Sequence, residues 1–306
     1  MGSAGSYQHI AVVEIPLPWP ADIVDHPDVA PASQDLRAAG VRVQAVTARG
    51  DGPDDLRRVL HFWRLSGPFR AYGHTERLIA QGEVAGALSA LAAGSTGQDT
   101  AAEPDRPSPT SAVVTDGATD VLICSHGRRD ACCGTLGTRL AERLTVPELP
   151  ELRVWRTSHT GGHRFAPTAM VLPEGTLWAY LDGELLCGIV TRTLDVDLAA
   201  GLYRGCTGLD APEVQACDRE ALRTLGWSWL DHARQGSVLQ RHNGATEVRL
   251  DHRAPDGTEG TFEATVEVAR WMPVPDCRKP LDQARKNAPE LRVTQLRTRP
   301  RFSTQG

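Results

Sequence analysis

The chain has 306 residues, of which 41% are hydrophobic and 23% charged, and its formal net charge is −5. A chain of this length is expected to fold as two or three modules. Its lysines and arginines are scattered along the sequence, which argues against nucleic acid as a partner. No stretch approaches the roughly 18 consecutive apolar residues of a membrane span, and the first residues lack the basic and apolar regions of a secretory signal. We therefore expect a soluble, cytoplasmic protein that binds neither nucleic acid nor membrane.

The first predicted domain covers residues 1–94. An apolar run at Ile10–Ile15 predicts a buried strand, and the prolines at positions 16, 18 and 20 end it in a rigid loop. Trp19, between two of these prolines, could be exposed and mark a contact site. Further along, periodicity predicts a short helix from Ser33, strands at Val41–Val46, Leu56–Trp63 and Thr75–Ala80, and a helix at Glu83–Ala93. The order is β-α-β-β-β-α.

Residues 95–117 are rich in Ser, Thr, Pro, Asp and Gly, which predicts a mobile linker. Residues 118–205 then repeat the earlier order, with predicted elements at Asp120–Cys124, Leu136–Leu144, Leu152–Thr157, Thr168–Leu172, Leu177–Leu181 and Thr193–Leu202. The repeat indicates two copies of one α/β unit. Residues 206–306 combine an amphipathic helix at Glu213–Leu225 with polar, alternating strands, which predicts a C-terminal α+β segment.

Two motifs place metal-binding side chains on glycine-containing loops directly after predicted strands. The first is C-S-H-G-R-R-D-A-C-C-G at Cys124–Gly134, and the second is H-T-G-G-H at His159–His163. The chain has 7 cysteines, and three of them fall within the first motif. In a chain expected to be cytoplasmic, such a cluster indicates metal or redox chemistry rather than a disulfide framework.

Thiolates together with imidazoles suit zinc, copper or an iron–sulfur centre. A helical zinc site is disfavoured, because Gly161 and Gly162 would each cost about 1 kcal/mol inside a helix and the motif has no glutamate base. These glycines instead favour a loop bent around a bulky centre, with its backbone close to bridging sulfides. Cys132 and Cys133 are neighbours whose side chains point apart, so one of them is expected to bind; Cys133 is favoured and Cys132 is the alternative.

The residues also carry a family resemblance. The first motif, followed by H-T-G-G-H-R-F-A-P-T and V-L-P-E-G, resembles the sucrase/ferredoxin-like family, whose core is similar to thioredoxin-like ferredoxins. The resemblance implies a [2Fe–2S] cluster held by Cys124, Cys133, His159 and His163. His126 is expected to support the ligands or to pack beside them rather than to bind. The resemblance also implies a thioredoxin-like ferredoxin domain at 118–205, with 1–94 as a degenerate α/β domain without ligands.

The expected function is therefore electron transfer, with a redox protein or a small molecule as the partner and no bond chemistry by the chain itself. Two neutral imidazoles in place of thiolates are expected to raise the reduction potential and to couple electron uptake to protons. Two alternatives stay open: a metal-free thiol–disulfide oxidoreductase using the three clustered cysteines, which the absence of a C-x-x-C motif disfavours, and a zinc-binding structural module.

Overall fold

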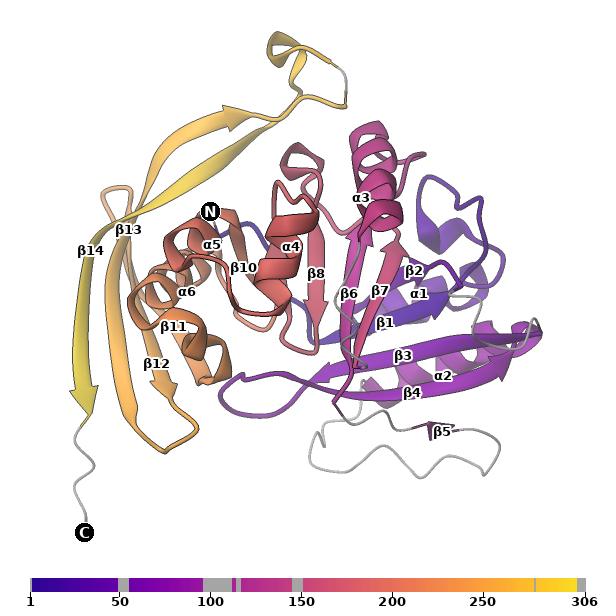
Figure 1. Cartoon of the computed structure of the whole chain (residues 1–306), viewed down its shortest axis with the longest axis horizontal. Helices are drawn as coiled ribbons and strands as arrows, with labels where there is room; N and C mark the ends of the chain where they lie inside the picture. Colours follow the sequence, from indigo (N-terminus) through magenta and orange to yellow (C-terminus); the bar gives the residue numbers. More distant parts are fainter. Residues whose placement is uncertain are drawn as a thin grey trace. The chain divides into compact units, whose positions relative to one another are not determined.

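The computed structural model describes residues 2–48, 55–95, 112–113, 117–144, 151–277 and 279–301. By its contacts the chain forms two compact units, which we describe separately (Figure 1). The N-terminal unit consists of Tyr7–Ser66 and Ala71–Pro173, and the C-terminal unit consists of Met1–Ser6, Gly67–Arg70 and Glu174–Gly306. Most of the predicted linker, 95–117, lies outside the described residues.

The N-terminal unit follows the predicted order of elements closely. Its strands and α-helices are β1 (His9–Glu14), α1 (Ser33–Ala38), β2 (Val41–Val46), β3 (Leu56–Arg64), β4 (Tyr72–Ala80), α2 (Val84–Ser95), β5 (Ala112–Val113), β6 (Thr119–Cys124), α3 (Thr138–Arg143), β7 (Leu152–Thr157) and β8 (Ala169–Leu172). One difference lies at the end of the cysteine motif. The predicted helix at Leu136–Leu144 is present as α3, but a π-helical turn, Cys133–Gly137, leads directly into it.

Within this unit the strands lie in the order β8-β6-β7-β2-β1-β3-β4-β5. β1 is parallel to β2 and antiparallel to β3, and β6 is likewise parallel to β7 and antiparallel to β8. β2 and β7 pair antiparallel and join the two sets of strands. Both predicted copies therefore contribute to one mixed sheet with helices, which confirms the α/β class. The predicted division of the chain into four segments stays a prediction.

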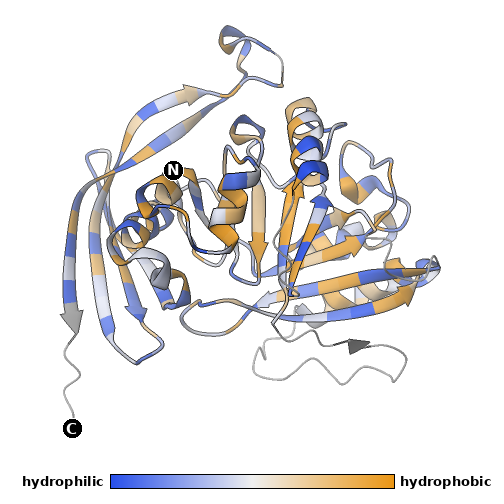
Figure 2. Ribbon diagram, in the orientation of Figure 1, coloured by the Kyte–Doolittle hydropathy of each residue, from blue (hydrophilic) through white to orange (hydrophobic). Residues whose placement is uncertain are grey.

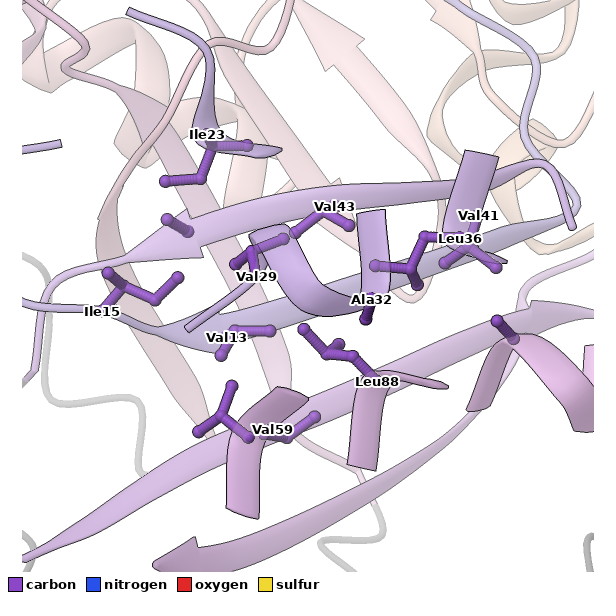
Figure 3. Packing of buried hydrophobic residues seen from close by; sticks show 14 of the residues in the cluster. Val13, Ile15, Ile23, Val29, Ala32, Leu36, Val41, Val43, Val59 and Leu88 are labelled. Atoms are coloured by element: carbon purple, nitrogen blue, oxygen red, sulfur yellow. The ribbon is translucent and has the colours of Figure 1, made fainter. Parts of the chain in front are cut away.

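The core of the first copy lies between the sheet and the helices α1 and α2 (Figure 3). β1 is buried along nearly its whole length, as expected for a continuous apolar run in the middle of a sheet. Trp19 belongs to this core: it is 2% exposed, and its indole N–H donates to the Ile15 carbonyl over 2.9 Å. The expectation that Trp19 is exposed was therefore wrong, because the proline-rich loop folds back over the sheet instead of pointing into solvent.

The C-terminal unit contains β9 (Thr176–Trp178), α4 (Gly183–Val190), α5 (Val196–Leu202), β10 (Tyr203–Cys206), α6 (Pro212–Leu225), β11 (Ala233–His242), β12 (Ala245–Arg253), β13 (Glu259–Pro273) and β14 (Asn287–Arg301). Strands β11 to β14 form an antiparallel sheet in chain order, which confirms the α+β segment. Figure 2 shows the β13–β14 hairpin alternating between hydrophilic and hydrophobic residues, as its sequence pattern predicts.

α4 was not predicted, since its sequence contains Gly183 and Gly188. It forms because Asp182 caps it by accepting the Leu185 N–H over 2.8 Å, and because Leu186 and Ile189 are buried. Among the described residues, none of the helices combines the length and apolar character needed to cross a bilayer.

Candidate metal centre

The two motifs meet at one edge of the sheet. Cys124 is the last residue of β6, and His159 follows the end of the parallel neighbour β7. The Ser125 N–H donates to the Thr157 carbonyl over 2.9 Å, so the two loops leave the sheet side by side. Parallel strands present their carboxyl ends at the same edge, which is where α/β proteins commonly bind ligands.

Cys124 and Cys133 form a buried thiol pair, each about 1% exposed. A hydrogen bond from the Cys133 thiol holds the pKa of Cys124 well below its usual value, and His159 adds a further hydrogen bond in the same direction. The pKa of Cys133 is raised, chiefly by this bond to Cys124 and by burial. Cys124 is therefore the thiol that ionises first, and thiolates are the form that binds metal.

Cys124 and Cys133 are held together because the backbone of the π-helical turn that begins at Cys133 packs closely against the end of β6. A Cβ built on Gly137 would lie 1.8 Å from the Cys124 carbonyl oxygen, and one on Gly134 would lie 2.3 Å from the Gly127 Cα. Glycine at both positions lets the π-helical turn pack directly against the end of β6 and against the loop that follows it. Cys133 begins this turn and so reaches Cys124.

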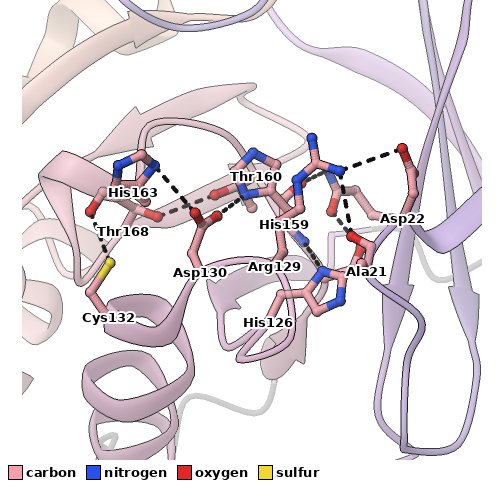
Figure 4. Close-up of polar contacts among 12 residues, drawn as sticks. Ala21, Asp22, His126, Arg129, Asp130, Cys132, His159, Thr160, His163 and Thr168 are labelled. Carbon is pink, nitrogen blue, oxygen red and sulfur yellow. Dashed lines mark hydrogen bonds and ion pairs between the residues drawn. The ribbon is translucent and has the colours of Figure 1, made fainter. Parts of the chain in front are cut away.

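Cys132 lies differently. It is half-buried, and its thiol donates to the backbone carbonyl of His163 over 3.5 Å (Figure 4). Its sulfur thus faces the histidine loop, whereas the neighbouring Cys133 faces Cys124. This geometry agrees with Cys133 as the favoured thiolate and with Cys132 as the alternative, and the assignment stays a prediction.

The side chain of Asp130 lies between the two histidines (Figure 4). One carboxylate oxygen is 2.6 Å from Nδ1 of His159, and the other is 3.2 Å from Nδ1 of His163. Burial acts to lower the pKa of His159, but the hydrogen bonds to Asp130 and Cys124 outweigh it and raise the pKa. Burial acts to raise the pKa of Asp130, and the bond from His159 outweighs it and lowers the pKa.

The glycines of H-T-G-G-H adopt the conformation that the bent loop requires. Gly161 has φ 88° and Gly162 has φ 75°, both in the left-handed region that favours glycine. The turn they form is not α-helical, and His163 begins a short 3₁₀ helix, His163–Phe165. The two histidines consequently converge on one carboxylate from a loop, as the rejection of a helical zinc site predicts.

His126 ties the two loops together through both ring nitrogens. Its Nδ1 accepts the His159 backbone N–H over 3.2 Å, and its Nε2–H donates to the Pro20 carbonyl over 2.7 Å. Burial lowers its pKa, which favours the neutral ring that these bonds require. Trp19 packs edge-on against the same imidazole, with ring centroids 5.7 Å apart. His126 therefore positions the backbone of a candidate ligand.

An aspartate in a short loop such as Cys124–Gly134 is expected to fix that loop through local hydrogen bonds, but Asp130 does more than this. Its backbone fixes the loop, since its N–H donates to the His126 carbonyl over 2.9 Å. The carboxylate, however, bridges both histidines, and only the folding of β7 beside β6 brings these motifs to it. A signal was present, because Asp130 is the one acid of a loop that otherwise carries two arginines and a histidine.

Comparison with known protein families supports the resemblance that the two motifs show. A model of the sucrase/ferredoxin-like family matches residues 1–205, about two thirds of the chain. No curated protein and no solved structure gave a match. The matched region contains both motifs, the whole of the N-terminal unit and the beginning of the C-terminal unit. The chain therefore belongs to the sucrase/ferredoxin-like family.

Proposed function

We propose that this protein transfers electrons through a [2Fe–2S] cluster bound by Cys124, Cys133, His159 and His163. The observation that carries the proposal is the contact of the buried Cys124–Cys133 pair with the His159 ring, with the Asp130 carboxylate beside Nδ1 of His159 and of His163. Two soft ligands that are buried and two borderline ligands that are partly exposed suit an iron–sulfur centre.

The surroundings of these residues fit such a group. Metal-bound histidines usually donate their second ring N–H to a carboxylate or a carbonyl, which fixes the tautomer and the ring orientation. The Asp130 carboxylate, 2.6 Å from Nδ1 of His159 and 3.2 Å from Nδ1 of His163, would serve as that acceptor, and each ring would then bind iron through Nε2. Cys124, with its lowered pKa, supplies the first thiolate.

When bound, the cluster supplies reversible one-electron chemistry. The chain orients the ligands, shields the thiolates by burial and sets the charge around them. Two neutral imidazoles in place of two thiolates remove about two negative charges, so the potential is expected to lie well above the roughly −400 mV of plant-type ferredoxins. Electron uptake is expected to be coupled to protons, so reduction should become harder as pH rises, because imidazole ligands can titrate where thiolates do not. The partner would be a redox protein or a small electron acceptor.

A second candidate function rests on the contact between Cys124 and Cys133. One thiol with a lowered pKa beside a second thiol is an arrangement that can form a disulfide, so a metal-free dithiol oxidoreductase is the alternative. Zinc held by the same four side chains would make the site structural.

Metal and sulfide analysis of freshly purified protein separates these functions. We expect a red-brown solution with about two irons and two sulfides per chain. Colourless protein with bound zinc, or with freely titratable thiols and no iron, would contradict the cluster.

Single serine variants then test the ligands. Cys133→Ser is expected to lose the cluster and Cys132→Ser to keep it. Cys187→Ser, which changes a half-buried cysteine of the C-terminal unit, is the matched control and should leave the spectrum unchanged. Loss of the cluster in the Cys132 variant alone would reverse the assignment.

A further inference from the structure

A cavity of about 170 Å³ lies beside the candidate metal centre, within the N-terminal unit. Its wall includes His126 and His159 on one side, and residues of α1 and β2 and the loop around Asp22 on the others. Pockets that bury drug-sized ligands measure about 300–1,000 Å³, so this cavity suits a smaller molecule and cannot enclose a dinucleotide.

The charge of the cavity wall is predominantly positive. Arg37, Arg42 and Arg129 line it, and Asp22 is the acidic residue among the lining side chains. A guanidinium carries five N–H donors in a planar fork that matches carboxylate and phosphate groups. Three such groups facing one cavity favour an anion.

The arginines retain capacity to bind. Arg42 is held in place by a hydrogen bond to the His159 carbonyl and by packing over the Tyr7 ring, 5.7 Å from its centroid. Arg129 makes two long contacts, to the Ala21 carbonyl at 3.4 Å and to Asp22 at 3.5 Å, and the Arg129 and Asp22 side chains are 44% and 52% exposed. The Arg37 side chain has no hydrogen-bonding or ion-pairing partner among the described residues.

Part of the wall is apolar. Ile23, Leu36 and Val43 line the cavity and are otherwise buried in the core. An inorganic anion would leave these side chains facing water, whereas a molecule with a compact apolar body would cover them.

We propose that this cavity binds a small organic anion, a carboxylate or a phosphate ester on a compact apolar body, beside the backbone of His159. The arginines hold the anionic group, and the aliphatic side chains of the core cover its body. The proposal goes beyond electron transfer and does not depend on which metal the neighbouring residues hold. A molecule bound there would lie next to the loop of a candidate ligand.

Calorimetric titration of the full-length purified protein tests this proposal with benzoate, phenyl phosphate, inorganic phosphate and the neutral benzamide. We expect saturable binding of benzoate or phenyl phosphate at one site per chain, and the tighter of the two identifies the anionic group. The double variant Arg37→Gln/Arg129→Gln is expected to bind at least about tenfold more weakly, because the loss of one hydrogen bond to a charged group is enough to raise the Kd by about this factor.

Arg139→Gln is the matched control, because Arg139 is exposed on α3 and lies outside the cavity wall. It should bind as the unchanged protein does. Any one of four results would overturn the proposal. These are equal affinity for benzamide and benzoate, equal affinity of the double variant and the unchanged protein, inorganic phosphate binding as tightly as phenyl phosphate, or no binding at millimolar concentration. Calorimetry needs no cluster, so such a failure would leave the electron-transfer proposal standing, and iron-free protein would equally leave this one standing.

Discussion

The bridge formed by Asp130 can be tested without any metal. In protein stripped of metal by a chelator, Asp130→Asn keeps the size of the side chain and one acceptor oxygen but removes the charge that faces His159 and His163. The Asp130 and His159 side chains are 10% and 24% exposed, and their atoms lie 2.6 Å apart. A hydrogen bond to a charged group contributes about 1.5–3 kcal/mol, and partial exposure places this one near the lower end. We expect the free energy of unfolding to fall by about 1–2 kcal/mol.

The loss should depend on pH in a defined way. Asp130 has a lowered pKa in the folded protein, so its contribution is present above its ordinary pKa of about 3.9 and disappears as pH falls through the folded value. His159 has a raised pKa, so its contribution is fully present below about 6.5 and disappears as pH rises through the folded value. The two contributions coincide between about pH 4 and pH 6.5.

Urea unfolding of the metal-free protein at pH 5.5 and pH 8.5 measures the difference. The matched control is Asp22→Asn, which removes a carboxylate that is 52% exposed and should change stability by less than about 0.5 kcal/mol. A destabilisation by Asp130→Asn that is equal at both pH values, or larger at pH 8.5, would refute the ion pair as its cause. NMR titration should also show a lower pKa for His159 in this variant, because burial lowers this pKa and the Asp130 charge that raises it is gone.

Three further outcomes follow from the same contacts. Gly137→Ala should lower the free energy of unfolding, measured by heat or urea, by about 1–3 kcal/mol and should lower the iron content, because its Cβ would lie 1.8 Å from a backbone oxygen. The control is Gly86→Ala on the exposed side of α2, which should leave stability unchanged or raise it slightly. In the C-terminal unit, Asp218→Asn should lower the free energy of unfolding by about 3–5 kcal/mol, because it leaves the fully buried Arg234 without its carboxylate, 3.0 Å away. The control Asp197→Asn, at an exposed ion pair, should change the free energy of unfolding by less than about 0.5 kcal/mol. Removing iron with a chelator under reducing conditions should abolish visible absorption and lower Tm, and an unchanged Tm would show that the bound group does not stabilise the fold.

Local patterns were enough to predict much of the fold. The apolar run of β1, the alternation in β2 and β7, and the amphipathic α6 carry their periodicity in their own residues, and the structure confirms them. The two glycines between His159 and His163 were also informative, because their left-handed φ values rule out an α-helix at that point. Each of these signals acts over a few neighbouring residues.

What the sequence did not reveal depends on contacts between distant residues. Trp19 is buried because a loop turns back over the sheet, and Asp130 bridges two histidines only once β6 and β7 lie side by side. The π-helical turn at Cys133 has no periodic signature, since it arises from the close approach of Gly137 to the end of β6. α4 was missed because its glycines lower the helix propensity that burial and an aspartate cap restore.

The antiparallel pairing of β2 with β7 gives this chain the internal arrangement of a two-fold symmetric dimer whose subunits have been fused. In such a pair the loops of one member can diverge while the shared interface persists. The proline loop at the end of β1 occupies the place that the cysteine loop has at the end of β6, and there its Pro20 carbonyl accepts a hydrogen bond from His126. The half that lacks both motifs thus acts as a permanently bound partner that covers one side of the candidate centre. Without it, the half that carries the motifs would be left with an unpaired strand and an open flank.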